Sequence, residues 1–349
     1  MGDESSIISS TSPPQKKKKV QRQIGTHNGQ FHADEALACF MLKQLPEFKN
    51  AEIIRTRDYK ILEDCDIVVD VGGVYDPVKN RFDHHQRTFN ENFNSLDSKK
   101  IWVTKLSSAG LVYFHFGRQL ISQTMEKSET DPITELIFDK IYERFIQEID
   151  GIDNGIDQTE EKPKYRITTG LSSRVGCLNP GWNQPQNNRD ELFEKAMELT
   201  GSELMERINY YKNTWLPARD IVLTAFNNRH NVDPSGEVMC FEKGGVPWKE
   251  HLFNLEEELK AETPVKYVLY QDLTGQWRVQ CVPLQDGGFQ NRLSLPEEWR
   301  GVRDDELSKK TGIKDCVFVH AGGFIGGNKT YEGVLKMAQK SLELNKVKK

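Results

Sequence analysis

The chain of 349 residues is long enough for two ordinary domains, and its 37% hydrophobic and 28% charged residues are typical of a globular protein. No stretch approaches the roughly 18 consecutive apolar residues that a membrane-spanning helix needs, so we expect no membrane association. The net charge of −5 is too small to gather nucleic acid by itself, and a polyanionic substrate would need a local positive feature or bound metal.

Residues 1–22 are expected to form a disordered basic arm, because a Ser/Thr/Pro tract precedes four consecutive lysines, Lys16 to Lys19. The lysine run fits a nuclear-import signal and a solvated tail about equally well. The arm has no apolar core, so it does not predict secretion. Six scattered cysteines without a CxxC pair indicate reduced thiols in an intracellular protein of the nucleus or the cytoplasm.

Strand-like and helix-like patterns alternate through the first half of the chain, which predicts an α/β domain with a parallel sheet. The strand patterns occupy residues 23–28, 51–56, 65–71 and 74–82. The helical faces occupy residues 33–45, 107–121 and 132–150. Because glycine commonly follows a helix, the last of these helices is expected to end at Asp150, just before Gly151.

The second half begins with residues 150–188, whose many Gly, Asn, Pro and Gln residues predict linker loops. A helical pattern returns over residues 191–215, and a final helix is expected to begin near Thr330. Strands are expected over residues 220–226, 265–271, 276–282 and 316–320. The predicted architecture is an α/β N-terminal domain, residues 23–188, and a smaller α+β C-terminal domain, residues 189–349.

Histidine and aspartate residues follow the predicted strands of the first domain, where ligands bind in α/β sheets, and recur at the end of its last helix. These residues are His27, His32, Asp34, Asp70, Asp83, His84, His85, Asp150 and Asp153. Each of them alone has an ordinary structural explanation as a cap or turn residue. Four chain segments that all offer imidazole or carboxylate groups, however, together predict a common metal site.

Carboxylate and imidazole ligands without thiolate suit Mn²⁺, Mg²⁺, Fe²⁺ or Zn²⁺. The set is too large for one ion, and Asp70, at a strand tip, can bridge two. Two-metal hydrolytic sites hold their ions ~3.5–4 Å apart, activate a water and stabilise the leaving oxygen of a phosphoryl transfer. The pattern therefore predicts a binuclear metal-dependent phosphoesterase. The rival hypothesis is a non-catalytic binding protein with structural metals, although structural sites tend to be rich in thiolates.

The ordered motifs HxxxxHxDE, VVDVGG and FDHH resemble the DHH phosphoesterase superfamily. The segments GTHNGQFHADEALACFMLK and DVGGVYDPVKNRFDHHQRTF closely resemble its eukaryotic melanocyte-proliferating-gene (Myg) family. The resemblance runs from Gln23 nearly to the C-terminus. It implies a DHH-like fold and a 3′–5′ exonuclease that acts on single-stranded RNA or oligonucleotides, with a mitochondrial location as a further option. A phosphoesterase for pyrophosphate or short oligonucleotides is the alternative enzyme.

The resemblance implies two ions, Mn²⁺ before Mg²⁺, in two sites that share Asp70. The implied ligands are His27, His32 and Asp70 for one ion, and Asp34, Asp70, His84 and Asp150 for the other. This chain departs from the usual first motif, because His32 stands where an aspartate is usual and lies one residue further from His27. In the fourth motif Asp153 stays open as the alternative to Asp150.

The resemblance also implies that His85 faces the substrate phosphate or protonates the leaving group, while Asp83 orients the imidazoles. In the second domain VHAGGFIGGNKT resembles the glycine-rich substrate-binding loop of DHH-associated domains. The implied substrate-binding residues are His320, Gly322, Gly323 and Lys329, with Arg174 as an assistant. Glycines let backbone N–H groups approach a phosphate, yet such a loop alone is often only a turn, and Arg174 fits a surface role equally well.

Overall fold

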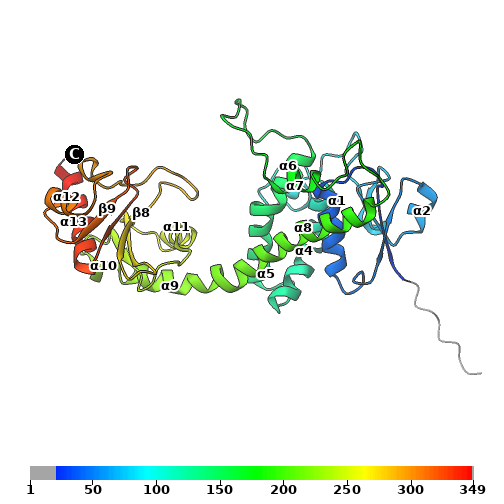
Figure 1. Cartoon of the computed structure of the whole chain (residues 1–349). Helices are drawn as coiled ribbons and strands as arrows, with labels where there is room; N and C mark the ends of the chain where they lie inside the picture. Colours follow the sequence, from blue (N-terminus) through cyan, green and yellow to red (C-terminus); the bar gives the residue numbers. More distant parts are fainter. Residues whose placement is uncertain (1–20, 348–349) are drawn as a thin grey trace, which may run out of the picture. The chain divides into compact units, whose positions relative to one another are not determined.

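The computed structural model of the protein describes residues 21–347 and separates into two compact units, residues 1–208 and residues 209–349 (Figure 1). Most of the predicted basic arm, residues 1–20, lies outside the described part of the chain. Within that part, no helix is both long enough and apolar enough to cross a membrane.

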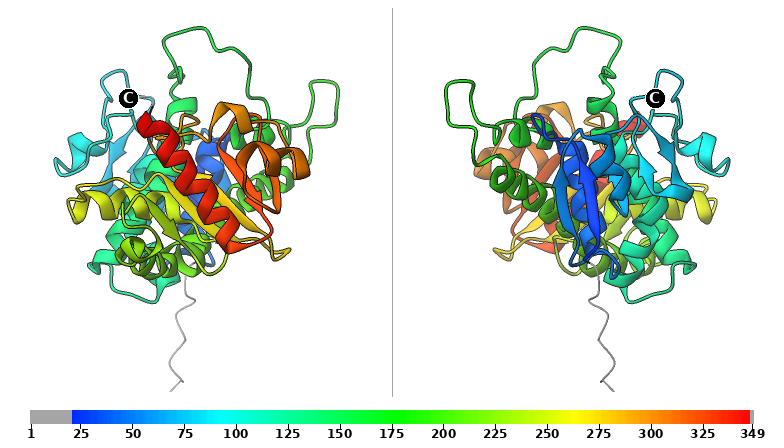
Figure 2. Two further views of the ribbon diagram at one scale, coloured as in Figure 1. Left: turned by 90° about the vertical axis from the view of Figure 1, so that its left-hand side faces the viewer. Right: turned by 90° about the vertical axis from the view of Figure 1, so that its right-hand side faces the viewer.

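The first unit is built on a five-stranded sheet in the order β2-β1-β3-β5-β4. The bounds are β1 (Gln23–Thr26), β2 (Glu52–Arg55), β3 (Ile67–Val69), β4 (Tyr75–Asp76) and β5 (Arg81–Phe82). All neighbouring strands are parallel except β4, which pairs antiparallel with β5. The right-hand view of Figure 2 shows these strands in blue and cyan. The parallel sheet confirms the α/β architecture that the sequence predicts for the N-terminal domain.

Helices follow the strands of this unit and cover the sheet. They are α1 (Ala33–Gln44), α2 (Tyr59–Asp64), α3 (Phe93–Leu96), α4 (Ser108–Met125), α5 (Pro132–Ile141), α6 (Gln147–Asp153), α7 (Leu171–Gly176) and α8 (Arg189–Tyr210). Helix α1 packs against α4, α6 and α7, so elements distant in sequence meet around its first turn. A π-helical turn, Tyr142–Ile146, joins α5 to α6 without a break in the helical backbone.

The second unit has a five-stranded sheet in the order β6-β7-β8-β10-β9, in which only β6 and β7 are parallel. Its strands are β6 (Val238–Cys240), β7 (Tyr267–Gln271), β8 (Trp277–Cys281), β9 (Cys316–Val319) and β10 (Ile325–Asn328). Its helices are α9 (Leu216–Asn227), α10 (Arg229–Val232), α11 (Trp248–Glu258), α12 (Asp304–Thr311) and α13 (Tyr331–Val347). This mixed sheet with helices confirms the α+β architecture expected for the C-terminal part.

The compact units divide between Ile208 and Asn209, whereas the sequence analysis places the domain boundary at residue 188. The difference arises from α8, whose side chains pack on the first unit. Phe193 of α8 meets the ring of Phe31 edge-on, with ring centroids 5.7 Å apart.

Two predicted elements differ from the structure. Residues 220–226, expected as a strand, lie in α9, because the buried residues Ala218, Val222 and Ala225 recur at helical spacing. The helix expected to end at Asp150 continues through Gly151 to Asp153. This extra turn places a second aspartate near the ends of the strands.

Candidate metal centre

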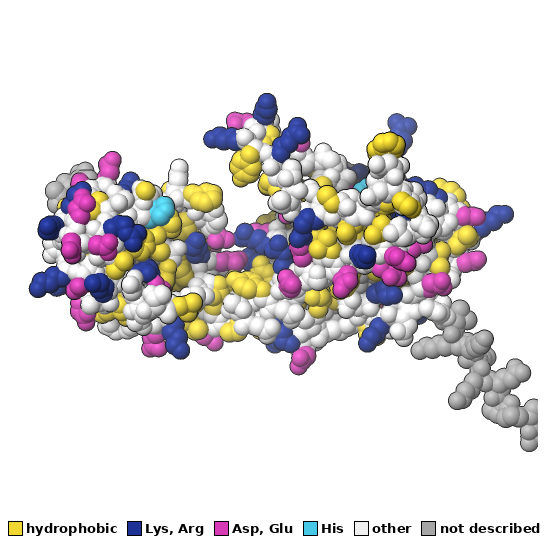
Figure 3. Space-filling model, viewed as in Figure 1, with side chains coloured by type: hydrophobic (Ala, Val, Ile, Leu, Met, Phe, Trp, Pro, Cys, Tyr) yellow, Lys and Arg dark blue, Asp and Glu magenta, His cyan; other side chains and the backbone are white. Residues whose placement is uncertain are grey.

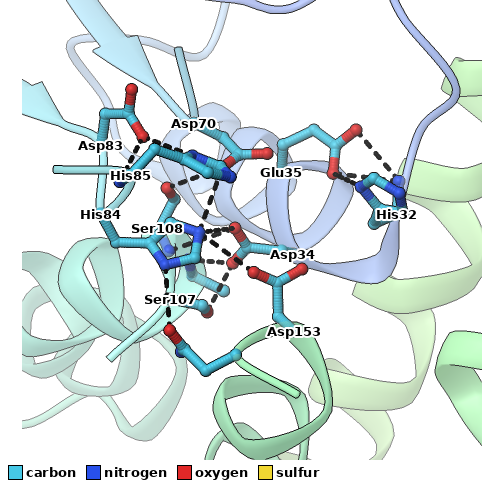
Figure 4. A network of polar contacts seen from close by, with 12 residues as sticks. His32, Asp34, Glu35, Asp70, Asp83, His84, His85, Ser107, Ser108 and Asp153 are labelled. Carbon is cyan, nitrogen blue, oxygen red and sulfur yellow. Dashed lines mark hydrogen bonds and ion pairs between the residues drawn. The ribbon is translucent and has the colours of Figure 1, made fainter. Parts of the chain in front are cut away.

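The carboxyl ends of β1, β3 and β5 and the first turn of α1 bring the predicted histidines and aspartates together (Figure 4). They surround a cavity of about 880 Å³. The cavity is lined by His27, His32, Asp34, Asp70, Asp83, His85 and Asp153. His84 lies buried directly behind this wall, and Asp150 does not line the cavity. The edge of the parallel sheet is therefore the place where the polar side chains converge, as expected.

The potential ligand atoms of the described residues form three groups, two of which share Asp70, while His84 links the second to the third. In one group His27 Nε2 lies 2.9 Å from Glu35 Oε1 and 3.3 Å from Asp70 Oδ2, and His32 stands beside them. Asp70 Oδ1 faces the other way and lies 3.4 Å from His84 Nε2. The two oxygens of Asp70 thus face different groups, which is the geometry that a carboxylate bridging two ions requires.

The second and third groups, which share His84, gather three carboxylates around its imidazole. His84 Nε2 lies 3.0 Å from Asp153 Oδ2 and 4.0 Å from Asp34 Oδ2, in addition to its contact with Asp70. Burial disfavours a charged His84, yet the close carboxylates of Asp153 and Asp70 outweigh it and raise the pKa of His84 to about 11. Burial also disfavours a charged His27, but the nearby carboxylates of Asp70 and Glu35 outweigh this effect and raise the pKa of His27 to about 9. These directions show that the cavity wall strongly favours positive charge.

The hydrogen bonds of Asn154 determine which nitrogen of His84 faces the carboxylates. Asn154 Nδ2 donates to the carbonyl oxygens of Lys105 (3.0 Å) and Asp150 (2.9 Å), so its Oδ1 faces His84 Nδ1 at 3.3 Å. His84 Nδ1 therefore carries the proton. The buried Nε2 has no partner in hydrogen-bond geometry among the described residues. In the neutral ring Nε2 presents its lone pair to the carboxylates, an arrangement that fits a cation held between them.

Asp83 orients His85 at the open side of the cavity. Asp83 Oδ1 accepts hydrogen bonds from His85 Nδ1 (2.7 Å) and from the backbone N–H of His85 (3.1 Å), and Asp83 Oδ2 accepts from Gly73 N (2.5 Å). The hydrogen bond to Asp83 raises the pKa of His85, whose side chain is 61% exposed. Asp83 and His85, which the sequence predicts to act together, are thus hydrogen-bonded through His85 Nδ1, and Asp83 does not contact His85 Nε2.

Asp150 belongs to none of the groups of potential ligand atoms among the described residues, whereas Asp153, its alternative, lies in one with Asp34 and His84. Asp150 is fully buried, and its oxygens accept hydrogen bonds from Ser107 N (2.9 Å), Ser107 Oγ (2.8 Å) and the Tyr142 hydroxyl (3.1 Å). Burial raises the pKa of Asp150 to about 7, although these hydrogen bonds oppose the rise. Asp150 therefore anchors the start of α4, while Asp153, one helical turn later, reaches His84.

Glu35 is the member of the first group that the sequence analysis did not include. It is fully buried in α1, and its carboxylate accepts a hydrogen bond from His32 N (3.0 Å) while facing His27. The spacing of His32 and Glu35 is that of a capping box, which satisfies backbone groups at a helix start. This spacing gives Glu35 an ordinary role in the sequence, and only its burial beside His27 marks it as a potential ligand.

The backbone and hydroxyl groups at the start of α4 hold Asp34. Its oxygens accept hydrogen bonds from Ala109 N (2.5 Å) and Ser108 N (3.1 Å), and its Oδ1 lies 2.6 Å from Ser107 Oγ, whose single proton Asp34 shares with Asp150. Burial raises the pKa of Asp34 well above its usual range, and the nearby Asp153 and Asp70 carboxylates add to this. Asp34 is therefore rigidly oriented, with Oδ2 on the side of His84.

The loop between His27 and His32 is fixed from two sides. Asn179 Oδ1 accepts from Phe31 N (3.0 Å), and its Nδ2 donates to Phe31 O (2.8 Å). Arg55 donates to Gly29 O (2.9 Å). The hydrogen bonds of these side chains reach only the backbone of the loop, and neither side chain lines the cavity, so they position the two histidines from outside it.

Replacing Asn179 by Ala is expected to lower the affinity for Mn²⁺ at the His27 group about tenfold, because the loop loses two hydrogen bonds that orient its ligands. Calorimetric titration of the metal-stripped protein with Mn²⁺ measures this change. The exposed Asn187, changed to Ala in the same way, serves as the control. Unchanged affinity in Asn179→Ala would show that the loop holds its shape alone.

The candidate substrate-binding residues of the second unit are not all neighbours. His320, Gly322 and Gly323 share the turn between β9 and β10, where Gly322 N donates to His320 Nδ1 (3.0 Å). Lys329 follows β10 at the opposite end of this hairpin, where its Nζ lies 3.8 Å from Asp315. In the first unit Arg174 pairs with Glu203 and lines a smaller cavity, which shares Ile149 with the cavity that the histidines surround.

Comparisons with known proteins agree with the resemblance seen in the sequence. The model of an uncharacterised protein family, UPF0160, whose short name is that of the MYG1 exonucleases, matches residues 23–342. The chain is 55% identical over 321 residues to the MYG1 exonuclease of Mus musculus, covering 92% of this chain and 84% of that protein. It is 51% identical over 335 residues to the MYG1 exonuclease of Homo sapiens, with coverages of 95% and 89%.

More distant relatives extend the same pattern. The MYG1 protein of Saccharomyces cerevisiae is 42% identical over 333 residues, covering 93% of this chain and 96% of that protein. A solved structure of RecJ with Mg²⁺ from Thermus thermophilus is 10% identical, covers 94% of this chain and 50% of that chain, and has a TM-score of 0.24, which is too weak to bear on the fold. The family match and the identities over nearly the whole chain establish that this protein belongs to the MYG1 exonuclease family.

Proposed function

We propose that this protein is a metal-dependent phosphodiester hydrolase that removes nucleotides from the 3′ end of single-stranded RNA. The observation that carries the proposal is Asp70, whose two carboxylate oxygens face two separate groups of ligand atoms. The mouse and human relatives, which are named MYG1 exonucleases, support the same class of reaction.

Two divalent ions, Mn²⁺ before Mg²⁺, would be held by this chain's carboxylates and imidazoles. The proposed ligands are His27, His32, Glu35 and Asp70 for one ion, and Asp34, Asp70, His84 and Asp153 for the other. Such a pair of ions, when bound, activates a water and offsets the negative charge of the phosphoryl oxygens. Asp153 takes the place of Asp150 in this proposal, because the Asp150 carboxylate is occupied by Ser107 and Tyr142.

His85 is proposed as the acid of the reaction. Asp83 holds its Nδ1, so Nε2 can face the substrate in the cavity. As water attacks the phosphorus and the P–O3′ bond breaks, His85 would donate a proton to the departing 3′ oxygen. The raised pKa of His85 keeps a larger fraction of the ring protonated at neutral pH, which suits this role.

The substrate is proposed to be single-stranded RNA or an oligonucleotide, with the turn that carries His320, Gly322 and Gly323 as a second phosphate-binding element. On the face drawn in Figure 3, basic and acidic side chains are interspersed, in keeping with the net charge of −5. Binding would therefore depend on local groups, not on a general basic surface. The six unpaired cysteines support an intracellular location, in the nucleus, cytoplasm or mitochondrion.

A phosphoesterase for pyrophosphate or short oligonucleotides is the second candidate. It is favoured by one observation: Arg57 is the single Arg or Lys among the described residues that line the cavity. A long RNA would be expected to contact several cations.

A degradation assay tests the proposal. Metal-stripped protein would be incubated with 5′-labelled single-stranded RNA, with and without Mn²⁺ or Mg²⁺, beside DNA of the same sequence and pyrophosphate. We expect a metal-dependent ladder that shortens from the 3′ end of the RNA. Hydrolysis of pyrophosphate or dinucleotides without any ladder would select the second candidate, and no hydrolysis at all by folded, metal-loaded protein would refute both.

A further inference from the structure

The short segment between β2 and α2 forms part of the wall of the cavity. Its turn is fixed by Asp58, whose N–H donates to Thr56 Oγ1 (3.1 Å) and whose carboxylate accepts from Lys60 N (2.9 Å). Arg57 and Tyr59 line the cavity, whereas Asp58 and Lys60 do not. Two alternate residues of an ordered turn therefore face the same space as the histidines.

Arg57 is a free cation in an acidic cavity. Its side chain is exposed and forms no hydrogen bond or ion pair with any residue that the structure describes, whereas the neighbouring Arg55 donates to Gly29 O and Asp190. A methyl group built on Gly29 would lie 3.2 Å from an Arg57 guanidinium nitrogen, so Arg57 lies over the loop that carries His27. An unpaired guanidinium with this placement suits a phosphate, which it binds through two parallel N–H groups.

Tyr59 stands next to this cation with its ring in solvent. It is 72% exposed, and its ring packs on no other aromatic ring of residues 21–347. An ordinary surface tyrosine needs no partner, but a tyrosine on a cavity wall two residues from an unpaired arginine matches the way in which proteins hold single-stranded nucleotides. There an aromatic ring stacks on a base while a cation binds the adjoining phosphate.

We infer that Arg57 and Tyr59 form a nucleotide-binding subsite beside the metal centre. Arg57 binds a phosphate next to the one that is hydrolysed, and Tyr59 stacks on the attached base. The inference rests on the proposed function for its substrate class, a nucleotide chain. The subsite would favour a nucleotide over pyrophosphate, because pyrophosphate has no base that could stack on Tyr59.

Binding measurements with full-length, Mn²⁺-loaded protein test the subsite. The probe is a fluorescent five-nucleotide RNA with phosphorothioate linkages that resist hydrolysis, followed by anisotropy. Arg57→Gln is expected to raise the dissociation constant about tenfold, because one charge-assisted contact is lost. The slope of log affinity against log salt should also fall in magnitude by about 0.7, the value for one phosphate contact on a single strand.

Tyr59→Ala is expected to weaken binding about fivefold, as the loss of one stacked base does. Tyr59→Phe keeps the ring and should bind like the unmodified protein. Lys60→Gln is the matched control, because it removes one positive charge from the same segment but from a residue outside the cavity. We expect it to leave both the affinity and the salt slope nearly unchanged.

The outcomes separate this inference from the proposed function. Equal binding by Arg57→Gln, Tyr59→Ala and the unmodified protein, or no binding by any of them, would overturn the subsite, whatever the degradation assay shows. Binding that depends on Arg57 and Tyr59, in a protein that hydrolyses no RNA, would keep the subsite and refute the proposed hydrolysis.

Discussion

Replacing Asp70 by Asn is expected to lower metal-dependent RNA hydrolysis roughly a thousandfold or more, the size of effect seen when a central member of a catalytic group is removed. Asp70 Oδ2 faces His27 and Oδ1 faces His84, so the substitution weakens both ligand groups at once. Asn is the appropriate replacement, because Asp70 has a positive φ of 56° and Asn tolerates this left-handed conformation. The fold should therefore remain intact.

Two measurements check the result: the amount of Mn²⁺ bound per chain, and the rate of shortening of the labelled RNA. Asp64→Asn provides the control, since it makes the same change of charge at an exposed residue of the nearby helix α2, outside the cavity. Full activity and two bound ions in Asp70→Asn would refute the shared-ligand arrangement.

Replacing Asp150 by Ala is expected to lower the free energy of unfolding by about 3 kcal/mol, because buried donors lose their acceptor. These donors are the N–H and hydroxyl of Ser107 and the hydroxyl of Tyr142. The Ser107 hydroxyl also lies 2.6 Å from Asp34, so the start of α4 should loosen. Urea unfolding followed by circular dichroism measures the loss.

The matched variant is Asp153→Ala, three residues later on the same helix. Its side chain is 16% exposed and reaches His84, so we expect little loss of stability and a large loss of metal binding and hydrolysis. The opposite pattern, a stable Asp150→Ala protein that no longer binds metal, would return Asp150 to the position of ligand.

The part of the site that follows strand ends could be predicted from the sequence. His27 and Asp70 come directly after β1 and β3, His84 follows β5 after one intervening residue, and parallel strands place their carboxyl ends at one edge. No knowledge of side-chain packing is needed for that step. The grouping of imidazoles with carboxylates followed from residue type and position alone.

The choice between Asp150 and Asp153 needed the packing of the helix. Gly151 looked like a helix exit, but it does not take the left-handed backbone conformation of a C-terminal glycine, and the helix continues to Asp153. Asp150 then points into the core and Asp153 toward His84. The strand predicted over residues 220–226 was wrong for a related reason, because a short apolar run does not distinguish a strand from a buried helix.

Glu35 and Arg57 were beyond the reach of the sequence for opposite reasons. Glu35 has the spacing of a helix cap, so its second role beside His27 appears only when the sheet places the two together. Arg57 is a candidate because its guanidinium group has no hydrogen-bond or ion-pair partner among the described residues, unlike that of Arg55, and a sequence does not show this. Likewise, Lys329 and His320 are close in the sequence, and their separation at opposite ends of the β9–β10 hairpin appears only in the structure.

The π-helical turn at Tyr142–Ile146 sets the angular phase of the residues that follow it. In an uninterrupted α-helix, residues eight apart differ by about 80° around the axis, since each residue turns by about 100°. One extra residue in a π turn nearly cancels that difference, so Tyr142 and Asp150 come to lie on one side and can bond. Deleting a single residue from this turn would rotate Asp150 out of the core and move Asp153 away from His84. The sequence would still contain every candidate ligand, but these side chains would no longer lie together.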